Sequence, residues 1–202
     1  MSSRRSFLAA VCAAGVICAL PATAPMAQSQ ASPEQLISEL GNELIAMLKI
    51  EGRAERETRF RGLLLKGVDV DLLAGFAIGR FRNELTADQR SEYRKLFEDF
   101  LVATYVSRLG LFSGEAFSIK TTQKLNDTEF LVQTLVTKPE SKPIRLDWRV
   151  RGMPGRYRII GVMVEGISMA VTQREEFAAV IQNGGGHVGV LLQRLRERAA
   201  GS

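Results

Sequence analysis

Few residues in this chain of 202 could carry catalysis. His187 is the single histidine, and it follows three glycines, Gly184 to Gly186, in a segment expected to be a loop. The glycines lack the Lys-Ser/Thr pair that completes a phosphate-binding loop. No serine stands in the sequence context of a nucleophile elbow. We therefore expect His187 to be an exposed loop residue and not a general base.

Metal ligands and acid–base pairs are equally sparse. Asp69 and Asp71 are one residue apart, but no further acids follow at the spacing of a calcium loop, and helix capping accounts for them better. One histidine and two cysteines cannot supply the spacing of a zinc site. Asp147 lies on the charged side of a predicted strand with no partner for acid–base work. The sequence therefore predicts no enzyme, no metal and no cofactor.

Residues 1–27 have the pattern of an export signal. Arg4 and Arg5 precede an apolar run, Phe7 to Leu20, that is too short for a membrane anchor. Cleavage is expected near Ala27. The order Ser3 to Leu8 fits a twin-arginine signal as well as an ordinary Sec signal, so both export routes stay open.

Residues 28–202 are expected to form one soluble domain in the periplasm. Both cysteines, Cys12 and Cys18, precede it, so no disulfide or thiol chemistry is expected. The whole chain carries a formal charge of +5, of which Arg4 and Arg5 supply two. This weak excess does not argue for a nucleic-acid partner. No later run is long and apolar enough to cross a membrane.

Hydrophobic spacing predicts helices, then strands, then helices. Ser32 should cap the first helix, Asp69 a short one, and the capping box Thr86 to Gln89 a long one that ends at Gly110. Later segments with helical spacing are 169–181 and 188–198. Four segments alternate with a period of two and are predicted strands: 117–121, 128–137, 144–151 and 157–164.

Short connections between these strands favour an antiparallel meander. The expected fold class is α+β, with helices packed on a twisted four-stranded antiparallel sheet. Glu165 to Met169 should form the corner from strand to helix, with Gly166 in the turn and Ser168 as the cap. Strands 128–137 and 157–164 are apolar on both faces, so the sheet must be covered on both sides or line an apolar space.

Several motifs occur in order along nearly the whole mature chain: Leu72 to Arg82, Leu85 to Arg90 with Tyr93, Phe97 to Leu101, Gly114 to Phe117, Ile144 to Trp148, Val164 to Met169, and Thr172 to Arg174 with Phe177. This ordered set resembles the MlaC family of periplasmic phospholipid-binding proteins, also called toluene-tolerance auxiliary proteins. The resemblance implies the substrate-binding component of an ABC-type lipid transport system that maintains outer-membrane lipid asymmetry. The partners implied are a phospholipid, an inner-membrane ABC lipid transporter complex and an outer-membrane lipoprotein complex.

The resemblance also implies a deep apolar cavity between the helices and the sheet, in which the acyl chains lie. Side-chain direction then gives the candidate lipid-binding residues. Those expected on the inward face of the sheet are Leu146, Trp148, Val150, Ile160, Val162 and Val164. Those expected on the long helix are Phe97, Phe100, Leu101 and Tyr105, while Phe76, Ile78 and Phe81 are candidates to close the mouth. A shift of one residue in strand phase would invert the strand choices.

Three alternatives stay open. A carrier of hopanoids or another hydrophobic lipid in the same superfamily is compatible with the twin-arginine-like signal and with Thr172 to Arg174. An enzyme would require an acid–base pair inside the cavity. A ligand-free adaptor of the transporter would show a filled core and an exposed apolar patch.

Overall fold

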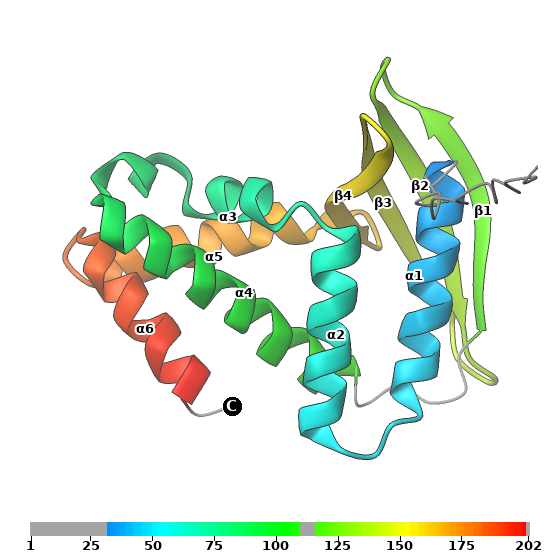
Figure 1. The fold of residues 1–202 in the computed structure, drawn as a ribbon, viewed down its shortest axis with the longest axis horizontal. Coiled ribbons are helices and arrows are strands. Elements are labelled where there is room, and N and C mark those ends of the chain that lie inside the picture. The colour runs from blue at the N-terminus through cyan, green and yellow to red at the C-terminus, as the bar shows by residue number, and fades with distance from the viewer. Residues whose placement is uncertain (1–31, 110–115, 201–202) are drawn as a thin grey trace, which may run out of the picture.

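The computed structural model describes residues 32–109 and 116–200 (Figure 1). Residues 1–27, with the expected export signal, and the expected helix end at Gly110 lie outside these ranges. The helices are α1 (Pro33–Leu48), α2 (Arg53–Gly67), α3 (Val70–Ile78), the 3₁₀ helix η1 (Gly79–Glu84), α4 (Ala87–Leu109), α5 (Met169–Asn183) and α6 (Val188–Ala200). The strands are β1 (Ala116–Lys124), β2 (Glu129–Thr137), β3 (Ile144–Met153), β4 (Arg156–Val164) and β5 (Ile167–Ser168).

The predicted helix starts are confirmed by their capping hydrogen bonds. The side chains of Ser32 and Asp69 accept backbone N–H groups in the first turns of α1 and α3, at 3.1 and 3.0 Å. Before α4, Thr86 and Gln89 form the reciprocal capping box, with distances of 3.0 and 3.2 Å. These side chains satisfy backbone donors that have no partner inside the helix.

The sheet is antiparallel with its strands in chain order, but it has five strands and not the four expected. Glu165 and Gly166 both have positive φ, 49° and 82°, which gives the two-residue turn typical of tight hairpins. The chain therefore folds back so that Ile167 pairs with Val164 as part of β5. Ser168 then caps α5 as predicted, with its side chain 3.4 Å from the N–H of Val171.

A β-bulge in β4 corrects the predicted strand phase. Val150 pairs with Ile159 and Arg149 pairs with Gly161, so Ile160 is an extra residue without a partner on β3. Ile159, and not Ile160, therefore packs in the buried cluster on the inner face of the sheet. Ile160 is buried, at 8% exposure, but belongs to neither hydrophobic cluster, and the bulge means that simple alternation does not assign it to the same face as Val162 and Val164.

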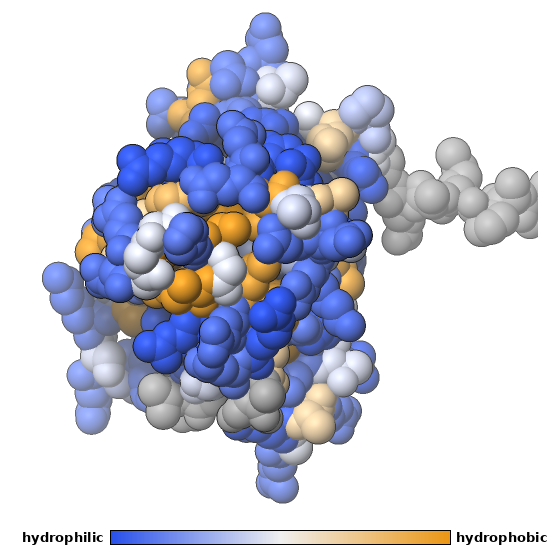
Figure 2. All heavy atoms as spheres, turned by 90° about the vertical axis from the view of Figure 1, so that its left-hand side faces the viewer, coloured by the Kyte–Doolittle hydropathy of each residue, from blue (hydrophilic) through white to orange (hydrophobic). Residues whose placement is uncertain are grey.

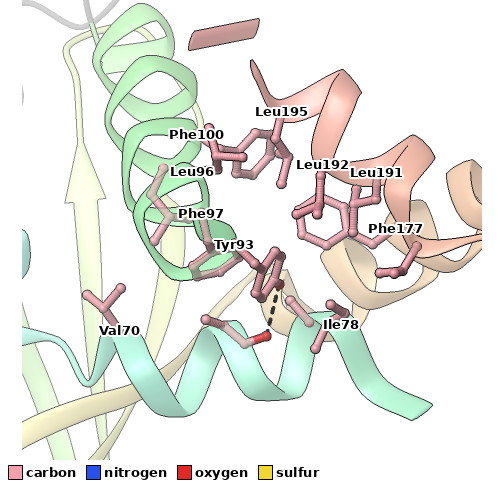
Figure 3. Packing of buried hydrophobic residues seen from close by; sticks show 14 of the residues in the cluster. Val70, Ile78, Tyr93, Leu96, Phe97, Phe100, Phe177, Leu191, Leu192 and Leu195 are labelled. Carbon is pink, nitrogen blue, oxygen red and sulfur yellow. Dashed lines mark hydrogen bonds between the residues drawn. The ribbon is translucent and has the colours of Figure 1, made fainter. Parts of the chain in front are cut away.

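Two hydrophobic cores hold the described residues together. The helical core joins residues of α2 to α6 (Figure 3): Leu64, Val70, Ala74, Ala77, Ile78, Phe81, Leu85, Tyr93, Leu96, Phe97, Phe100, Leu101, Val102, Val106, Phe177, Ile181, Val188, Leu191, Leu192 and Leu195. Inside it, the Tyr93 hydroxyl donates to the carbonyl oxygen of Ala74 at 2.9 Å, which ties α4 to α3. Burial raises the pKa of Tyr93 well above its ordinary range, so this hydroxyl stays a donor.

The second cluster, the sheet core, lies between α1 and the inner face of the sheet. It consists of Leu36, Ile37, Val132, Val150 and Ile159. The helix approaches the sheet closely at Gly41, because a Cβ there would lie 2.7 Å from the ring of Phe117 on β1. A glycine in α1 thus sets the distance between helix and sheet.

The segment between α2 and α3 joins the two cores. Val68 packs against both clusters and forms a parallel bridge with Ile159 of β4. The backbone N–H of Asp69 donates to the Ile159 carbonyl at 2.9 Å, and an Arg158 guanidinium nitrogen donates to the Leu65 carbonyl at 3.2 Å. Strand β4 therefore anchors the helices of the helical core to the sheet.

Ion pairs cover the outer face of the sheet. Asp147, 1% exposed, pairs with Arg145 at 2.6 Å. Glu129, 6% exposed, pairs with Arg149 at 2.5 Å and with Arg151 at 2.8 Å. These hydrogen-bonded pairs satisfy carboxylates that would otherwise be costly to bury. Asp147 thus has an ion-pair partner that the sequence did not reveal.

Replacing Gly41 with Ala should destabilise the protein. The added Cβ would force α1 away from Phe117, which we expect to lower the free energy of unfolding by about 1–3 kcal/mol despite the better helix propensity of alanine. Urea denaturation followed by circular dichroism measures the change. Gly62→Ala in α2 is the matched control: nothing lies within 4 Å of its Cβ, so it should stabilise by up to about 1 kcal/mol. Equal effects of the two variants would contradict close packing at Gly41.

Glu129 should make the fold sensitive to acid. Hydrogen bonds from Arg151 and Arg149 hold the pKa of Glu129 below its ordinary value of 4.5. A carboxyl with a lowered folded-state pKa stabilises the fold above its unfolded-state pKa, and this stability is lost as pH falls through the folded-state pKa. Glu129→Gln should therefore lower stability at pH 7 and weaken its pH dependence below about pH 4.5. Denaturation curves between pH 3 and 7 test this, with the exposed Glu175→Gln as control; identical pH profiles for Glu129→Gln and the unmodified protein would refute it.

Candidate functional site

The inner face of the sheet is divided into a covered half and an open half. In the covered half, α1 buries Val132, Val150 and Ile159 to 0–2% exposure. The open half consists of Leu146, Trp148, Val162 and Val164, all of which are only half-buried. Trp148 pairs with Val162 and Leu146 pairs with Val164, so these four side chains form one continuous apolar block across β3 and β4.

A buried threonine accepts the hydrogen bond of the one polar group in the Trp148 side chain. The indole Nε1–H donates to the Thr134 hydroxyl at 2.9 Å, and that hydroxyl donates to the Leu146 carbonyl at 3.1 Å. Thr134 is fully buried. Rotating the ring would leave its buried N–H without a partner, which is unfavourable. The hydrogen bond to Thr134 therefore also fixes the orientation of the ring. The open half thus offers an apolar surface with a tryptophan held in one position.

The predicted residues of the long helix lie elsewhere, in the helical core. Phe97 and Phe100 on α4 contact Phe177 of α5, with ring centroids 6.1 and 5.5 Å apart, and Leu101 is buried in the same core. Tyr105 packs against the edge of this core and stacks on a phenylalanine of α2 at 6.3 Å. The structure therefore places the predicted lining in two clusters, one between helices and one on the sheet.

The three residues predicted to close the mouth of the cavity do not lie together. Ile78 and Phe81 are buried in the helical core, at 2% and 7% exposure. Phe76 is 38% exposed, and the guanidinium of Arg174 lies over its ring at 5.4 Å from the centroid. Ile78 and Phe81 thus take part in helix packing, whereas Phe76 remains at the surface.

Several residues that were not predicted to belong to the site lie next to the open half. Leu36 and Ile37 of α1 cover the neighbouring sheet core, Leu40 packs against it, and Val68 connects it to the helices. Thr134 holds the tryptophan. Two features of the sequence could have indicated these residues. The first helix has an apolar stripe that can cover a sheet, and Thr134 lies between Val132 and Val136 on the same face of its strand.

The residues that could do other chemistry are dispersed. His187 is exposed, as predicted. Asp147 is bound by Arg145 on the outer face of the sheet, away from the open half. Among residues 32–109 and 116–200, no group of three or more His, Cys, Asp or Glu side chains could hold a metal ion. No helix in these same ranges has the length and apolar character to span a membrane.

A solved structure shares this arrangement of helices and sheet. It is a phospholipid-binding protein from Ralstonia solanacearum, determined in complex with a phospholipid. The two chains are 25% identical and superpose with a TM-score of 0.69; the match covers 86% of this chain and 98% of the Ralstonia chain. The similarity thus extends over almost the whole of that protein.

A protein-family comparison agrees with the structural one. The family model described as MlaC protein matches residues 34–197, which include every helix and strand described above except for the first and last few residues. Both findings indicate a binding or transport protein. The resemblance inferred from the ordered motifs is confirmed: this chain belongs to the MlaC family.

Proposed function

We propose that this chain is a non-enzymatic carrier that binds a phospholipid through its acyl chains on the open half of the sheet. The observation that carries the proposal is the half-buried apolar block of Leu146, Trp148, Val162 and Val164 in a chain that resembles a solved phospholipid complex. Covering this block with acyl chains completes the burial that α1 provides for the other half of the face.

The physical chemistry of the open half suits a lipid and not a catalyst. Each buried methylene contributes about 0.8 kcal/mol, so two acyl chains supply ample binding energy without any directional contact. The indole N–H of Trp148 is already satisfied by Thr134, so an apolar ligand leaves no donor of this ring unpaired. A headgroup would remain close to solvent, where its charge stays hydrated.

The same proposal extends to the cellular role. Residues 1–27 would direct the chain to the periplasm, where it would carry lipid between an inner-membrane ABC transporter complex and an outer-membrane lipoprotein complex. Such a system maintains outer-membrane lipid asymmetry. Half-burial of the open half supports a carrier, because a lipid on a surface that stays partly accessible can be transferred without unfolding of the helical core.

Native mass spectrometry tests the proposal. Protein purified from the periplasm without detergent should carry a stoichiometric adduct, and solvent extraction should identify it as a phospholipid. An adduct with hopanoid mass would contradict the phospholipid assignment. A protein that stays lipid-free after incubation with labelled phospholipid would refute the carrier and support a ligand-free adaptor.

Leu146→Glu should strongly reduce phospholipid retention, because it places a charge in the apolar block. We expect at least a tenfold loss, since burying an unpaired carboxylate opposes binding by more than about 1.4 kcal/mol. Extracted lipid per protein measures retention, and Val162→Glu should behave alike. Leu125→Glu is the matched control: Leu125 is 43% exposed in the connection between β1 and β2, away from the open half, so a carboxylate there stays hydrated. Unchanged retention in a folded Leu146→Glu variant would refute the assignment of the open half.

A further inference from the structure

A groove lies between η1 and α5. The helical core faces away from the sheet at the end where η1 lies (Figure 1). The volume of the groove is about 190 Å³. The polar lining consists of Arg80, Arg174 and Gln182, and the apolar lining includes Ile78, Phe81 and Ala178. Figure 2 looks onto this end of the molecule and shows apolar residues at the centre, framed by hydrophilic ones.

Both arginines are held over aromatic rings. The Arg174 guanidinium lies 5.4 Å from the centroid of Phe76, and the Arg80 guanidinium lies 5.0 Å from that of Phe81. A Cβ on Gly79 would lie 3.0 Å from the Arg174 Nε, so Arg174 extends over the backbone next to Arg80. Stacking restrains a guanidinium while leaving the N–H groups at its edge available. Two oriented cations therefore meet at one groove.

These cations lack the acidic partners that other arginines have. Arg94 pairs with Asp71, and Arg196 pairs with Glu92 at 2.5 Å. Within residues 32–109 and 116–200, neither Arg80 nor Arg174 forms an ion pair. A third cation, Arg82, follows on η1, with a guanidinium nitrogen 3.7 Å from the Cβ position of Gly75. The positive charge at the groove is thus not neutralised by described side chains.

We infer that this groove binds the phosphate of a phosphate ester. Guanidinium groups match phosphate oxygens with two parallel N–H donors, and the Gln182 amide can add a further donor. The apolar lining residues can contact the carbon part of the ester. A volume of about 190 Å³ fits a group the size of a lipid headgroup but not acyl chains. The site is separate from the open half and goes beyond the proposed function.

The phosphate could belong to a soluble ester or to a lipid headgroup in a membrane, and two assays separate these sources. Calorimetric titration of the mature chain with sn-glycerol 3-phosphate detects the soluble ester. Flotation with phosphatidylcholine vesicles, with and without phosphatidic acid, detects the headgroup. Binding in the first assay alone assigns a soluble ester, whereas flotation that requires phosphatidic acid assigns a headgroup; either result supports the site.

Arg80→Gln and Arg174→Gln should each weaken binding about tenfold, as expected for the loss of one charge-assisted contact. Arg90→Gln is the matched control, since it removes the same charge from an exposed position on α4 that does not line the groove. Circular dichroism verifies folding. Absence of binding in both assays, or an equal loss in Arg90→Gln, would overturn the inference. Lipid retention by the open half should be unchanged in all three variants, so failure of this inference is distinguishable from failure of the proposed function.

Discussion

One helix cannot cover the inner face of this sheet. A helix with its side chains is about 10 Å wide, whereas a strand of nine residues is about 30 Å long, so one helix cannot shield every strand along its whole length. The sixteen residues of α1 lie close to the sheet because Gly41 permits it, and they bury Val132, Val150 and Ile159. The apolar block of Leu146, Trp148, Val162 and Val164 on the same face is left half-buried. On β3 and β4 the helix buries Val150 and Ile159 but not the block farther along the same two strands, so the candidate site follows from the mismatch between the width of a helix and the length of the strands.

The helical core stabilises the fold although the open half of the sheet is not fully covered. It contains its own aromatic cluster, including Phe97, Phe100 and Phe177, and therefore does not depend on the sheet for its burial. Its attachment to the sheet runs through Val68 and the hydrogen bond from Asp69 to Ile159 of β4. The lipid that we propose for the open half would thus exchange while both cores stay packed. This separation of stability from binding is what a carrier requires, since it must release its cargo without unfolding.

Much of the fold could be predicted from the sequence because local patterns determine it. Capping residues such as Thr86 and Gln89 located the helix starts, and alternation located the strands β1 to β4. The bulge at Ile160 and the hairpin to β5 were missed because each depends on pairing with another strand. For the site, spacing identified apolar faces but not their partners. It could not show that Phe97 and Phe100 pack on α5, or that α1 lies over the sheet core, because many helix arrangements share one stripe pattern.

Trp148 allows the most direct test of lipid binding on the open half, because it is the only tryptophan in the chain. Its fluorescence should be measured with phospholipid brominated in the middle of the acyl chains, since bromine quenches an indole only at short range. Acyl chains on the open half should quench the fluorescence strongly at one lipid per protein, and a lipid of the same headgroup without bromine should quench it little. Stoichiometric binding of the brominated lipid with Trp148 unquenched would place the acyl chains elsewhere and contradict lipid binding on the open half.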